Sequence, residues 1–262
     1  GLELRRAMRI YTIIFGLGLF RIHSMAQQSI QQEPLAALKG PFRPGDSLPD
    51  WNFGGSTVVT DNYLRLTPTE SAHAGHVWSQ RKLTYSAFEI EMQFKVTGAR
   101  YMGGDGFALW ITENAEQSGG TFGNADDFKG LGIIFDTYDN DGQRDNPSIS
   151  LIQSNGTLRF NHDKDGSDQK IPNAHCNFNY RNPRTPLSVK INYQDGALRV
   201  SHDNYGNGDF SDCLRAPAVA IPRSFHVGVT AHTGQVADNH DVYLLRVTDL
   251  SPPAADPAAA DP

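Results

Sequence analysis

The residues best suited to chemistry lie in one short stretch, IIFDTYDNDGQRDNP, at residues 133–147. The stretch opens with an apolar run and then places Asp136, Asp139, Asn140 and Asp141 close together. Carboxylates this near to one another repel, and a bound cation would relieve that repulsion. A turn of solvated Asp and Asn side chains is the other interpretation. The stretch alone does not decide between the two.

A helix–loop–helix calcium loop is one pattern that such acids could form, but the sequence does not fit it. That pattern needs an aspartate at its first position, a glycine at its sixth and a glutamate at its twelfth. Alignment on Gly142 places Thr137 first and Ser148 twelfth. The residues before the loop are also typical of a strand, so a cation here would need another arrangement of ligands.

The predicted strand could present several ligands on one face. If it continues through the acidic stretch, Asp136, Tyr138 and Asn140 lie at every second position and share a face. One strand cannot surround an ion, so a second segment must contribute. NHDKDGSD, at residues 161–168, is a second acidic loop and a candidate for that role. Carboxylate, amide and backbone carbonyl oxygens are the ligands that calcium prefers.

Two further segments combine glycine with polar side chains. Asp105 lies in GGDGFALW (103–110), where the glycines would let the backbone come close to a ligand. HTGQVADNHD (232–241) also holds glycine, amide and acid groups between two expected strands. Each feature has an ordinary explanation as well, because an isolated Asp-Gly pair is usually a turn and a loop histidine such as His162 usually faces solvent.

The sequence holds no clear pattern for catalysis. Glu89 and Glu91 are the only glutamates two positions apart, and they fit the polar face of a strand better than the spaced acid pair of a glycosidase. A nucleophile elbow, a zinc-binding HExxH segment and a phosphate-binding glycine loop are all missing. We therefore expect a protein that is not an enzyme.

The candidate residues must be positioned by strands, because the chain has the periodicity of β-structure throughout. Residues 88–96 alternate strictly between apolar and polar, as in a sheet with one wet face. Residues 106–112 and 131–138 are more continuously apolar, as in strands covered on both faces. Asn155-Gly156 and Asp195-Gly196 predict hairpin turns. The pattern predicts an all-β, two-sheet sandwich, formed by one domain over residues 35–250.

Composition restricts the setting in which this domain works. The 262 residues carry a net charge of −6 and no run of Lys or Arg, which argues against nucleic acid and anionic membranes as partners. No second hydrophobic span follows the N-terminal one, so membrane association would need a segment absent from this chain. The sequence makes no prediction about oligomeric state.

The N-terminal segment predicts entry into the secretory pathway. Residues 1–26 have the basic, apolar and small-residue parts of a secretory signal peptide, and residues 251–262 predict a Pro/Ala/Asp-rich linker. In an oxidising compartment Cys176 and Cys213 would form one disulfide bond. The sequon that begins at Asn155 would accept a glycan there.

Taken together, these segments resemble the leguminous-type (L-type) lectin family, in particular its mannose-binding cargo receptors of the endoplasmic reticulum, intermediate compartment and Golgi. The resemblance covers nearly all of residues 35–250. It rests on GHVWSQ, GDGFALW, GLGIIFDTYDNDG with DNP, NHDKDG, the cysteine pair and HTGQVADNHDV. It implies a concanavalin-like jelly-roll β-sandwich that binds high-mannose N-glycans through a site organised by Ca²⁺.

The resemblance also implies roles for individual residues. The principal calcium ion would be held by Asp136, the backbone carbonyl of Tyr138, Asn140 and Asp165. Ligands for a second calcium ion would be Asp139, Asp141, Asp145 and Asn146. Contacts to the sugar would come from Asp105, Asn140, His162 and the loop Gly234-Gln235-Val236, with stacking on Tyr138 or Phe128.

Two positions depart from the family pattern. Relatives often have serine where this chain has His76, and Gly-Gly-Leu or Gly-Asp-Leu where it has Gly234-Gln235-Val236. That loop helps to set which mannose arm is accepted, so fine specificity is not predicted. The implied function is a sorting or transport receptor for glycoproteins in the lumen of the early secretory pathway. A secreted adhesive or structural protein and, less favoured, a glycosidase on the same sandwich are the alternatives.

Overall fold

A computed structural model describes residues 33–43 and 48–253. The predicted signal peptide at 1–26 lies outside the described residues, and so does the predicted linker beyond residue 253. Within the described part of the chain the one helix is a short 3-10 turn, η1 (His162–Lys164). No helix among these residues is long and apolar enough to cross a membrane. The candidate residues therefore lie at strand ends and in the loops between strands, except His162, which lies in η1.

The first of the two large sheets has eight strands within the described residues. They run in the order β15 (Ser211–Ala216), β14 (Ala197–Asp203), β13 (Leu187–Gln194), β6 (Phe88–Thr97), β17 (Asn239–Asp249), β4 (Leu64–Thr67) and β3 (Val58–Val59), and β1 (Leu38–Lys39) pairs with β17. The predicted alternation along β6 is confirmed, because its apolar side chains are buried and its polar ones are partly exposed.

The outer face of this sheet carries the two glutamates of β6. A carboxylate oxygen of Glu89 lies 3.4 Å from the amine of Lys190, and one of Glu91 lies 3.0 Å from the guanidinium of Arg246. Both acids are thus neutralised by basic side chains of neighbouring strands. This is a charged sheet surface and gives no support to the glycosidase alternative.

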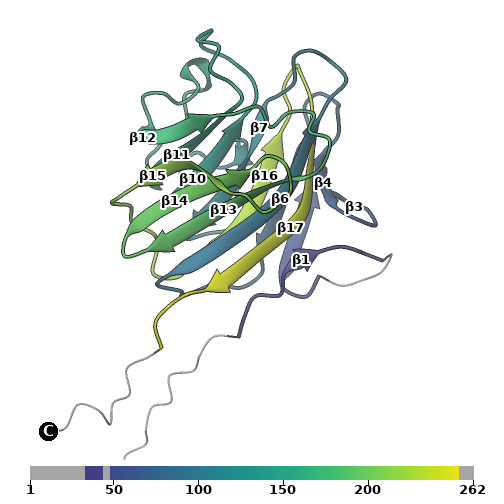
Figure 1. Ribbon diagram of the computed structural model, residues 1–262. Helices are drawn as coiled ribbons and strands as arrows, with labels where there is room; N and C mark the ends of the chain where they lie inside the picture. The colour runs from purple at the N-terminus through teal and green to yellow at the C-terminus, as the bar shows by residue number, and fades with distance from the viewer. Residues whose placement is uncertain (1–32, 44–47, 254–262) are drawn as a thin grey trace, which may run out of the picture. The chain divides into compact units, whose positions relative to one another are not determined.

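The second large sheet has seven strands in the described chain. The order is β12 (Lys170–Asn177), β11 (Ser148–Asn155), β10 (Lys129–Asp136), β7 (Gly106–Thr112), β16 (His226–His232), β5 (Ala74–Ser79) and β2 (Trp51–Gly55). Figure 1 shows it packed behind the first sheet. The apolar core lies between them, where Phe107 of β7 stacks on Phe135 of β10 with ring centroids 4.3 Å apart.

The second sheet is also covered on its other face, which explains why β7 is buried along its whole length. Trp110 points to that face and meets Phe128 with ring centroids 4.9 Å apart. Phe122, which lies between β8 (Ser118–Gly119) and β9 (Gly123–Asn124), packs there against Phe160. The continuous apolar runs in the sequence are therefore strands between two apolar layers.

The two predicted hairpins have opposite outcomes. Asp195 and Gly196 both have positive φ, 53° and 76°, and join β13 to β14 as expected. The hairpin predicted at Asn155-Gly156 is wrong, because β11 ends at Asn155 and pairs with β12 instead. The chain after Gly156 leaves the sheet, since Phe160 packs into the apolar layer over Trp110 and Phe122. Because the chain leaves the sheet here, residues 161–168 form a loop that contains η1 instead of a strand.

The two sheets are joined covalently at one side. Cys176 of β12 and Cys213 of β15 form a disulfide, with their Cα atoms 5.2 Å apart, and this confirms the predicted pairing. Both strands are the terminal strands of their sheets on that side. The disulfide therefore links an edge strand of one sheet to an edge strand of the other.

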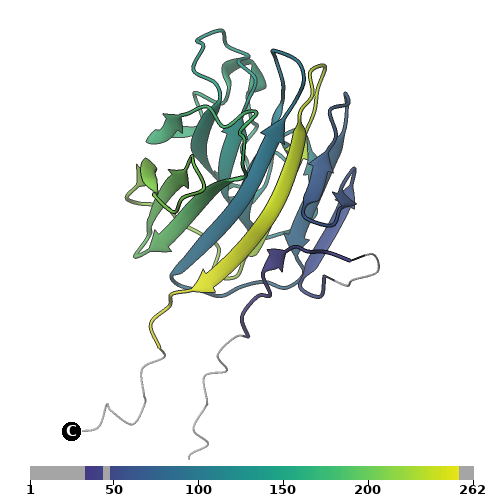
Figure 2. The same ribbon diagram turned by 45° about the vertical axis from the view of Figure 1, so that its right-hand side comes forward.

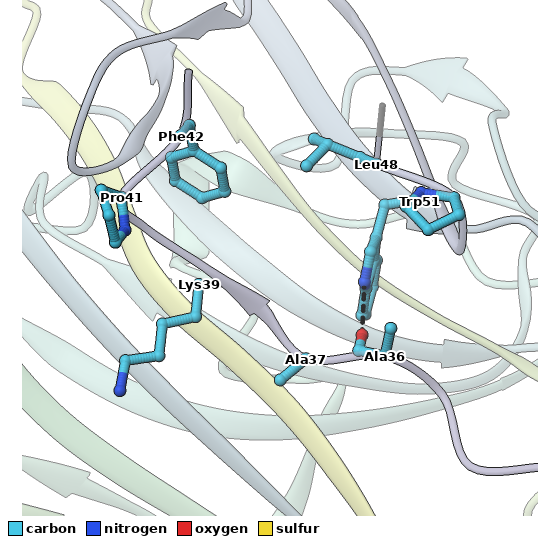
Figure 3. Close-up of a pocket in the computed structure, with 8 residues that line it drawn as sticks. Ala36, Ala37, Lys39, Pro41, Phe42, Leu48 and Trp51 are labelled. Atoms are coloured by element: carbon cyan, nitrogen blue, oxygen red, sulfur yellow. Dashed lines mark hydrogen bonds between the residues drawn. The ribbon is translucent and has the colours of Figure 1, made fainter. Parts of the chain in front are cut away.

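A hollow beside β2 is shown in Figure 3, between the N-terminal segment and Trp51. The indole nitrogen of Trp51 donates a hydrogen bond of 2.8 Å to the carbonyl of Ala36, and Phe42 forms the opposite wall. Its described lining residues include no acid, so it is unlike the predicted ion site.

The loops that matter for the candidate site meet at one end of the sandwich. Figures 1 and 2 show the β6–β7 and β16–β17 loops side by side, at the end opposite to the one where β17 finishes. The amide of Asp238 donates to the carbonyl of Gly104 at 3.1 Å, which joins these two loops.

Candidate metal centre and ligand site

The acidic stretch begins where β10 ends, at Asp136. This residue pairs with Gly106 of β7 and Ser148 of β11, and it is only 4% exposed. Its Oδ1 accepts a hydrogen bond of 3.2 Å from the amide of Tyr138. Burial raises the pKa of Asp136 well above its ordinary value, and the charge of Asp165 raises it further. The protein alone therefore disfavours the ionised form of this carboxyl.

Asp165 joins the second acidic loop to the first. It follows η1 with a φ of 48° and is 2% exposed. Its carboxylate accepts the amide hydrogens of Asn140, at 3.0 Å, and Asp141, at 3.3 Å. Burial raises the pKa of Asp165 to about 6, against the opposing effect of these two hydrogen bonds. The structure thus brings together the two acidic loops that the sequence hypothesis linked.

The donor set fits a hard cation. In the described part of the chain neither Asp136 nor Asp165 forms an ion pair with a lysine or arginine. Asn146 donates from Nδ2 to the carbonyl of Tyr138 at 2.6 Å, while its Oδ1 is buried without a hydrogen-bond partner among these residues. Carboxylates without an ion-pair partner, together with a buried amide oxygen that accepts no hydrogen bond, are groups that Ca²⁺ can satisfy.

A second group of acids lies next to the first. Oxygens of Asp139, Asp141, Asp145 and Asp165 all lie within 4.8 Å of one another. The sequence interpretation placed the first three with Asn146 at a second ion and kept Asp165 for the principal one. The structure places the carboxylate of Asp165 in this second group as well, so Asp165 could contribute to either of the two proposed ion sites.

The turn interpretation of the stretch also describes part of it. Asp139 accepts the amides of Gly142, at 2.7 Å, and Arg144, at 3.0 Å, and Asp141 accepts that of Gln143 at 2.9 Å. These bonds shape the loop as Asp and Asn side chains do in ordinary turns. The two interpretations are therefore compatible: Asp139 and Asp141 fold the loop, and buried Asp136 and Asp165 concentrate charge beneath it.

Asp105 is held next to this centre, immediately before β7. Its carbonyl accepts the amide and the hydroxyl of Thr137, at 3.0 and 2.9 Å. Its carboxylate lies 2.7 Å from Nδ1 of His232 and accepts the amide of Gly234 at 3.1 Å. The peptide bond that precedes it, Gly104–Asp105, is cis. Asp105 therefore connects the end of β10 with the Gly234 loop.

His232 is the residue that sequence reasoning missed. The motif that contains it was recognised, but no role was assigned to its first residue. The contact with Asp105 follows from the antiparallel register, which sets His232 opposite Gly106. The signal that could have found it is its position as the last strand residue before the glycine loop.

Small residues let the neighbouring loops approach. A Cβ on Gly234 would lie 2.7 Å from Oδ1 of Asp105, and one on Gly104 would lie 3.0 Å from Val236 and 3.1 Å from Tyr138. Gly104 therefore sits between Tyr138 and Val236. Gln235, at the tip of the loop, is exposed.

His162 is anchored at the side of the site. Its Nε2 lies 3.1 Å from the carbonyl of Gly120, and its ring packs against Phe160 at 4.7 Å and Phe122 at 5.5 Å. Because Nε2 must donate to that carbonyl, Nδ1 is the ring nitrogen left for a ligand.

Three other sequence candidates have clear positions. Asn140 is exposed beside Asp165 and Tyr138 is half-buried. The suggestion that Phe128 could stack on a sugar is wrong, because Phe128 is 2% exposed and packs on Trp110. His76 faces the same side of the second sheet as Trp78, and burial lowers the pKa of His76.

A fold and site of this kind, with an acidic centre on the end loops of a two-sheet sandwich, define a lectin-like binding domain. The model of the legume-like lectin family matches residues 30–257. The chain belongs to this family.

Relatives and solved structures agree with the match. Protein ERGIC-53 of Mus musculus is 35% identical over 230 residues, which are 86% of this chain and 44% of the relative. Vesicular integral-membrane protein VIP36 of Canis lupus familiaris is 36% identical over 208 residues, which are 78% of this chain and 58% of the relative. The chain thus spans about half the length of these curated relatives.

The structural neighbours show the fold. The exoplasmic/lumenal domain of VIP36 in its Ca²⁺/Man-bound form has a TM-score of 0.78 and 33% identity, covering 84% of this chain and 92% of that one. A legume lectin-like domain from Entamoeba histolytica has a TM-score of 0.70 at 20% identity, covering 84% of this chain and 100% of that one. The predicted jelly-roll sandwich is confirmed.

Proposed function

We propose that this chain is a calcium-dependent lectin for mannose and high-mannose N-glycans. We further propose that it serves as a sorting or transport receptor for glycoproteins, without catalysis, in the lumen of the early secretory pathway. One observation carries the proposal: two buried carboxylates without an ion-pair partner in the described chain, Asp136 and Asp165, lie beside Asp105, whose own carboxylate is fixed by His232 and Gly234. The VIP36 structures solved with Ca²⁺ and mannose-containing ligands support it.

Residues of two loops would hold the metal. Ligands for the principal ion would be Asp136, the carbonyl of Tyr138, Asn140 and Asp165. A second ion would use Asp139, Asp141, Asp145 and the buried Oδ1 of Asn146. When bound, Ca²⁺ supplies positive charge that offsets the repulsion among these carboxylates. The loops then keep one arrangement, which lowers the entropic cost of binding a sugar.

The chain's own residues would contact the sugar. Asp105 uses one oxygen toward His232 and the other toward Gly234, and an ionised carboxylate retains lone pairs that can accept hydroxyl hydrogens. The side chain of Asn140 can both donate and accept. Nδ1 of His162 and the loop Gly234-Gln235-Val236 would complete the ring of polar contacts around the ligand.

The proposed location rests on two features that are typical of secreted and lumenal proteins, a disulfide bond and a glycosylation sequon. The disulfide between Cys176 and Cys213 is typical of an oxidising compartment. Asn155 is exposed at the end of β11, where an attached glycan would meet no obstruction from a buried surface. One of the curated relatives is named a vesicular integral-membrane protein, VIP36, which supports this proposal.

The test is calorimetric titration of a high-mannose oligosaccharide into the protein, in calcium and again in chelator. We expect binding in calcium, no binding in chelator and no release of reducing sugar. An Asn140→Ala variant should lose binding, and an Asp209→Asn variant, altered at an exposed acid outside the site, should keep it. High-mannose binding that persists in chelator would sink the proposal.

A further inference from the structure

The imidazole of His232 has one nitrogen that the contacts described so far do not use. Its Nδ1 lies 2.7 Å from Oδ2 of Asp105. An ionised carboxylate can only accept a hydrogen bond, so Nδ1 donates and, in the neutral ring, Nε2 is left as an acceptor. Among the described residues Nε2 has no hydrogen-bond partner. The ring therefore offers a second acceptor beside the carboxylate of Asp105.

The neighbouring strands do not cover this ring. In the register of the second sheet, His232 of β16 is paired with Ala74 of β5 on one side and with Gly106 of β7 on the other. Ala74 is exposed, and the side chain of His232 is 34% exposed. Since glycine and alanine are the smallest residues, neither of these neighbours can shield the imidazole. A ligand at Asp105 can therefore reach it.

The positions of His232 and Asp105 relative to each other are fixed by backbone and side chain together. The amide of Asp105 donates to the carbonyl of His232 at 3.1 Å, in addition to the contact between the two side chains. The other carboxylate oxygen of Asp105 accepts the amide of Gly234 at 3.1 Å, so the carboxylate cannot turn without breaking a bond. Two acceptors held in this way lose little conformational entropy when a ligand binds.

We propose that Nε2 of His232 accepts a hydrogen bond from one hydroxyl of the bound mannose, next to a hydroxyl that donates to Asp105. The inference rests on the proposed function and deepens it, because the contact would determine which hydroxyls the ligand must carry. Sugars have hydroxyls on neighbouring carbons, and these match two acceptors that lie side by side. A ligand without one of these hydroxyls would leave an acceptor unpaired in the complex, which lowers its affinity.

Two variants separate this contact from the support that the ring gives to Asp105. In His232→Asn the side-chain amide can replace Nδ1 and still donate to Asp105, but it does not extend to the position of Nε2. In His232→Gln the amide extends to the position of Nε2, and Asp105 loses this donor. His226→Asn is the matched control, because His226 lies on the same strand and its Nδ1 is 2.8 Å from the carbonyl of Ser79.

The experiment titrates the full chain, in calcium, with methyl α-mannoside and with its 2-, 3-, 4- and 6-deoxy forms. In wild type, loss of the hydroxyl that bonds Nε2 should weaken binding about 5-fold. This penalty should disappear in His232→Asn and persist in His232→Gln and in the control. Calcium affinity should be equal in all four proteins, because the ring bonds Asp105 and not a proposed metal ligand.

Other results overturn the inference in distinct ways. The same set of deoxy penalties in wild type and His232→Asn would show that the ring contacts no hydroxyl, while the proposed lectin function stands. A penalty kept in His232→Asn and lost in His232→Gln would make His232 a support for Asp105 only. If one variant does not fold, the other decides by itself. Wild-type protein that binds no mannoside would overturn both the proposed function and this contact.

Discussion

Two groups of buried aspartates in this domain differ in how their charge is compensated. Asp238 and Asp241, on the β16–β17 side, each face a guanidinium: Arg181 at 2.8 Å and Arg65 at 2.8 Å. Asp136 and Asp165, on the β10 side, form no ion pair with a lysine or arginine among the described residues; Lys170 lowers the pKa of each only in part, and both pKa values remain raised by burial. The buried fraction is similar in the two groups, so burial alone does not distinguish them.

We infer from this difference that the paired acids stabilise the fold, whereas Asp136 and Asp165 are suited to binding a cation. A carboxylate paired with arginine is satisfied in the isolated chain and makes no demand on a ligand. An unpaired buried carboxylate costs free energy unless it is protonated or a positive ion binds. The four predictions that follow test this distinction, from the largest expected effect to the smallest.

Breaking a paired acid should cost the most stability. Arg181→Met leaves Asp238 buried without its partner, and we expect the free energy of unfolding to fall by about 3–5 kcal/mol. Arg246→Met is the control, because its ion pair with Glu91 is on the surface and should be worth less than about 1 kcal/mol. Urea unfolding measures both. Equal losses for the two variants would contradict the distinction.

Lowering the pH should reduce the free energy of unfolding through protonation of His240, which lies near the paired acid Asp238. This residue is fully buried, hydrogen-bonds Thr67 at 2.7 Å and lies near Asp238, Asp105 and His232, and burial lowers its pKa from 6.5 to about 4. In the unfolded chain His240 takes up a proton near pH 6.5, whereas in the folded protein it does so only near pH 4. The stability that its burial in the neutral form contributes above pH 6.5 is therefore lost as the pH falls toward 4. The loss should approach about 3 kcal/mol.

A variant isolates this contribution from those of other groups. Unfolding at saturating calcium, followed from pH 7 to pH 4, should have a shallower pH slope in His240→Asn than in wild type. The comparison uses the slope and not the level, because the smaller side chain leaves a cavity at every pH. Identical slopes would show that His240 is not the group that titrates.

Removing an unpaired acid should abolish function and spare the fold. Asp136→Asn should weaken calcium binding by roughly 100-fold, because it removes a charged ligand. Without calcium its stability should equal or exceed that of wild type, since one buried charge is gone. Calcium titration and thermal unfolding in chelator give the two readings, with Asp209→Asn as control. A clear loss of calcium-free stability would put Asp136 with the paired acids.

The smallest effect is expected from the glycine loop. Gly234→Ala forces its Cβ toward Asp105, which must move, and we expect roughly 10-fold weaker mannose binding. Calcium affinity should not change, because Gly234 contacts none of the proposed metal ligands. A parallel loss of calcium affinity would mean that the sugar and metal loops do not act separately.

Much of the fold could be predicted because its signals are local. The alternation from Phe88 to Val96 and the turn at Asp195-Gly196 are properties of neighbouring residues. The turn at Asn155-Gly156 carried the same local signal and was overridden, because Phe160 packs against Phe122 in the outer apolar layer and the chain after Gly156 leaves the sheet. Packing between residues far apart in the sequence cannot be predicted from a short segment.

Candidate residues could be found in the sequence where residue type reveals their chemistry, and they were missed where position in the fold decides. The acids of the 136–141 stretch and Asp165 are conspicuous in the sequence. His232 looks like any strand histidine, and only the pairing of β16 with β7 places it against Asp105, 127 residues earlier. The compensation by Arg181 was likewise invisible, because it joins residues 57 apart.

The disulfide gives the sandwich two unequal sides. Cys176 and Cys213 bind β12 to β15, so these edge strands cannot drift apart as the sheets loosen. On the other side β2 and β3 end their sheets without such a link within the described chain. We therefore expect opening fluctuations to start at β2 and β3, so that backbone amides there exchange with solvent before those of β12 and β15. The two acidic loops lie on this linked side, because residues 137–147 join β10 to β11 and residues 161–168 precede β12.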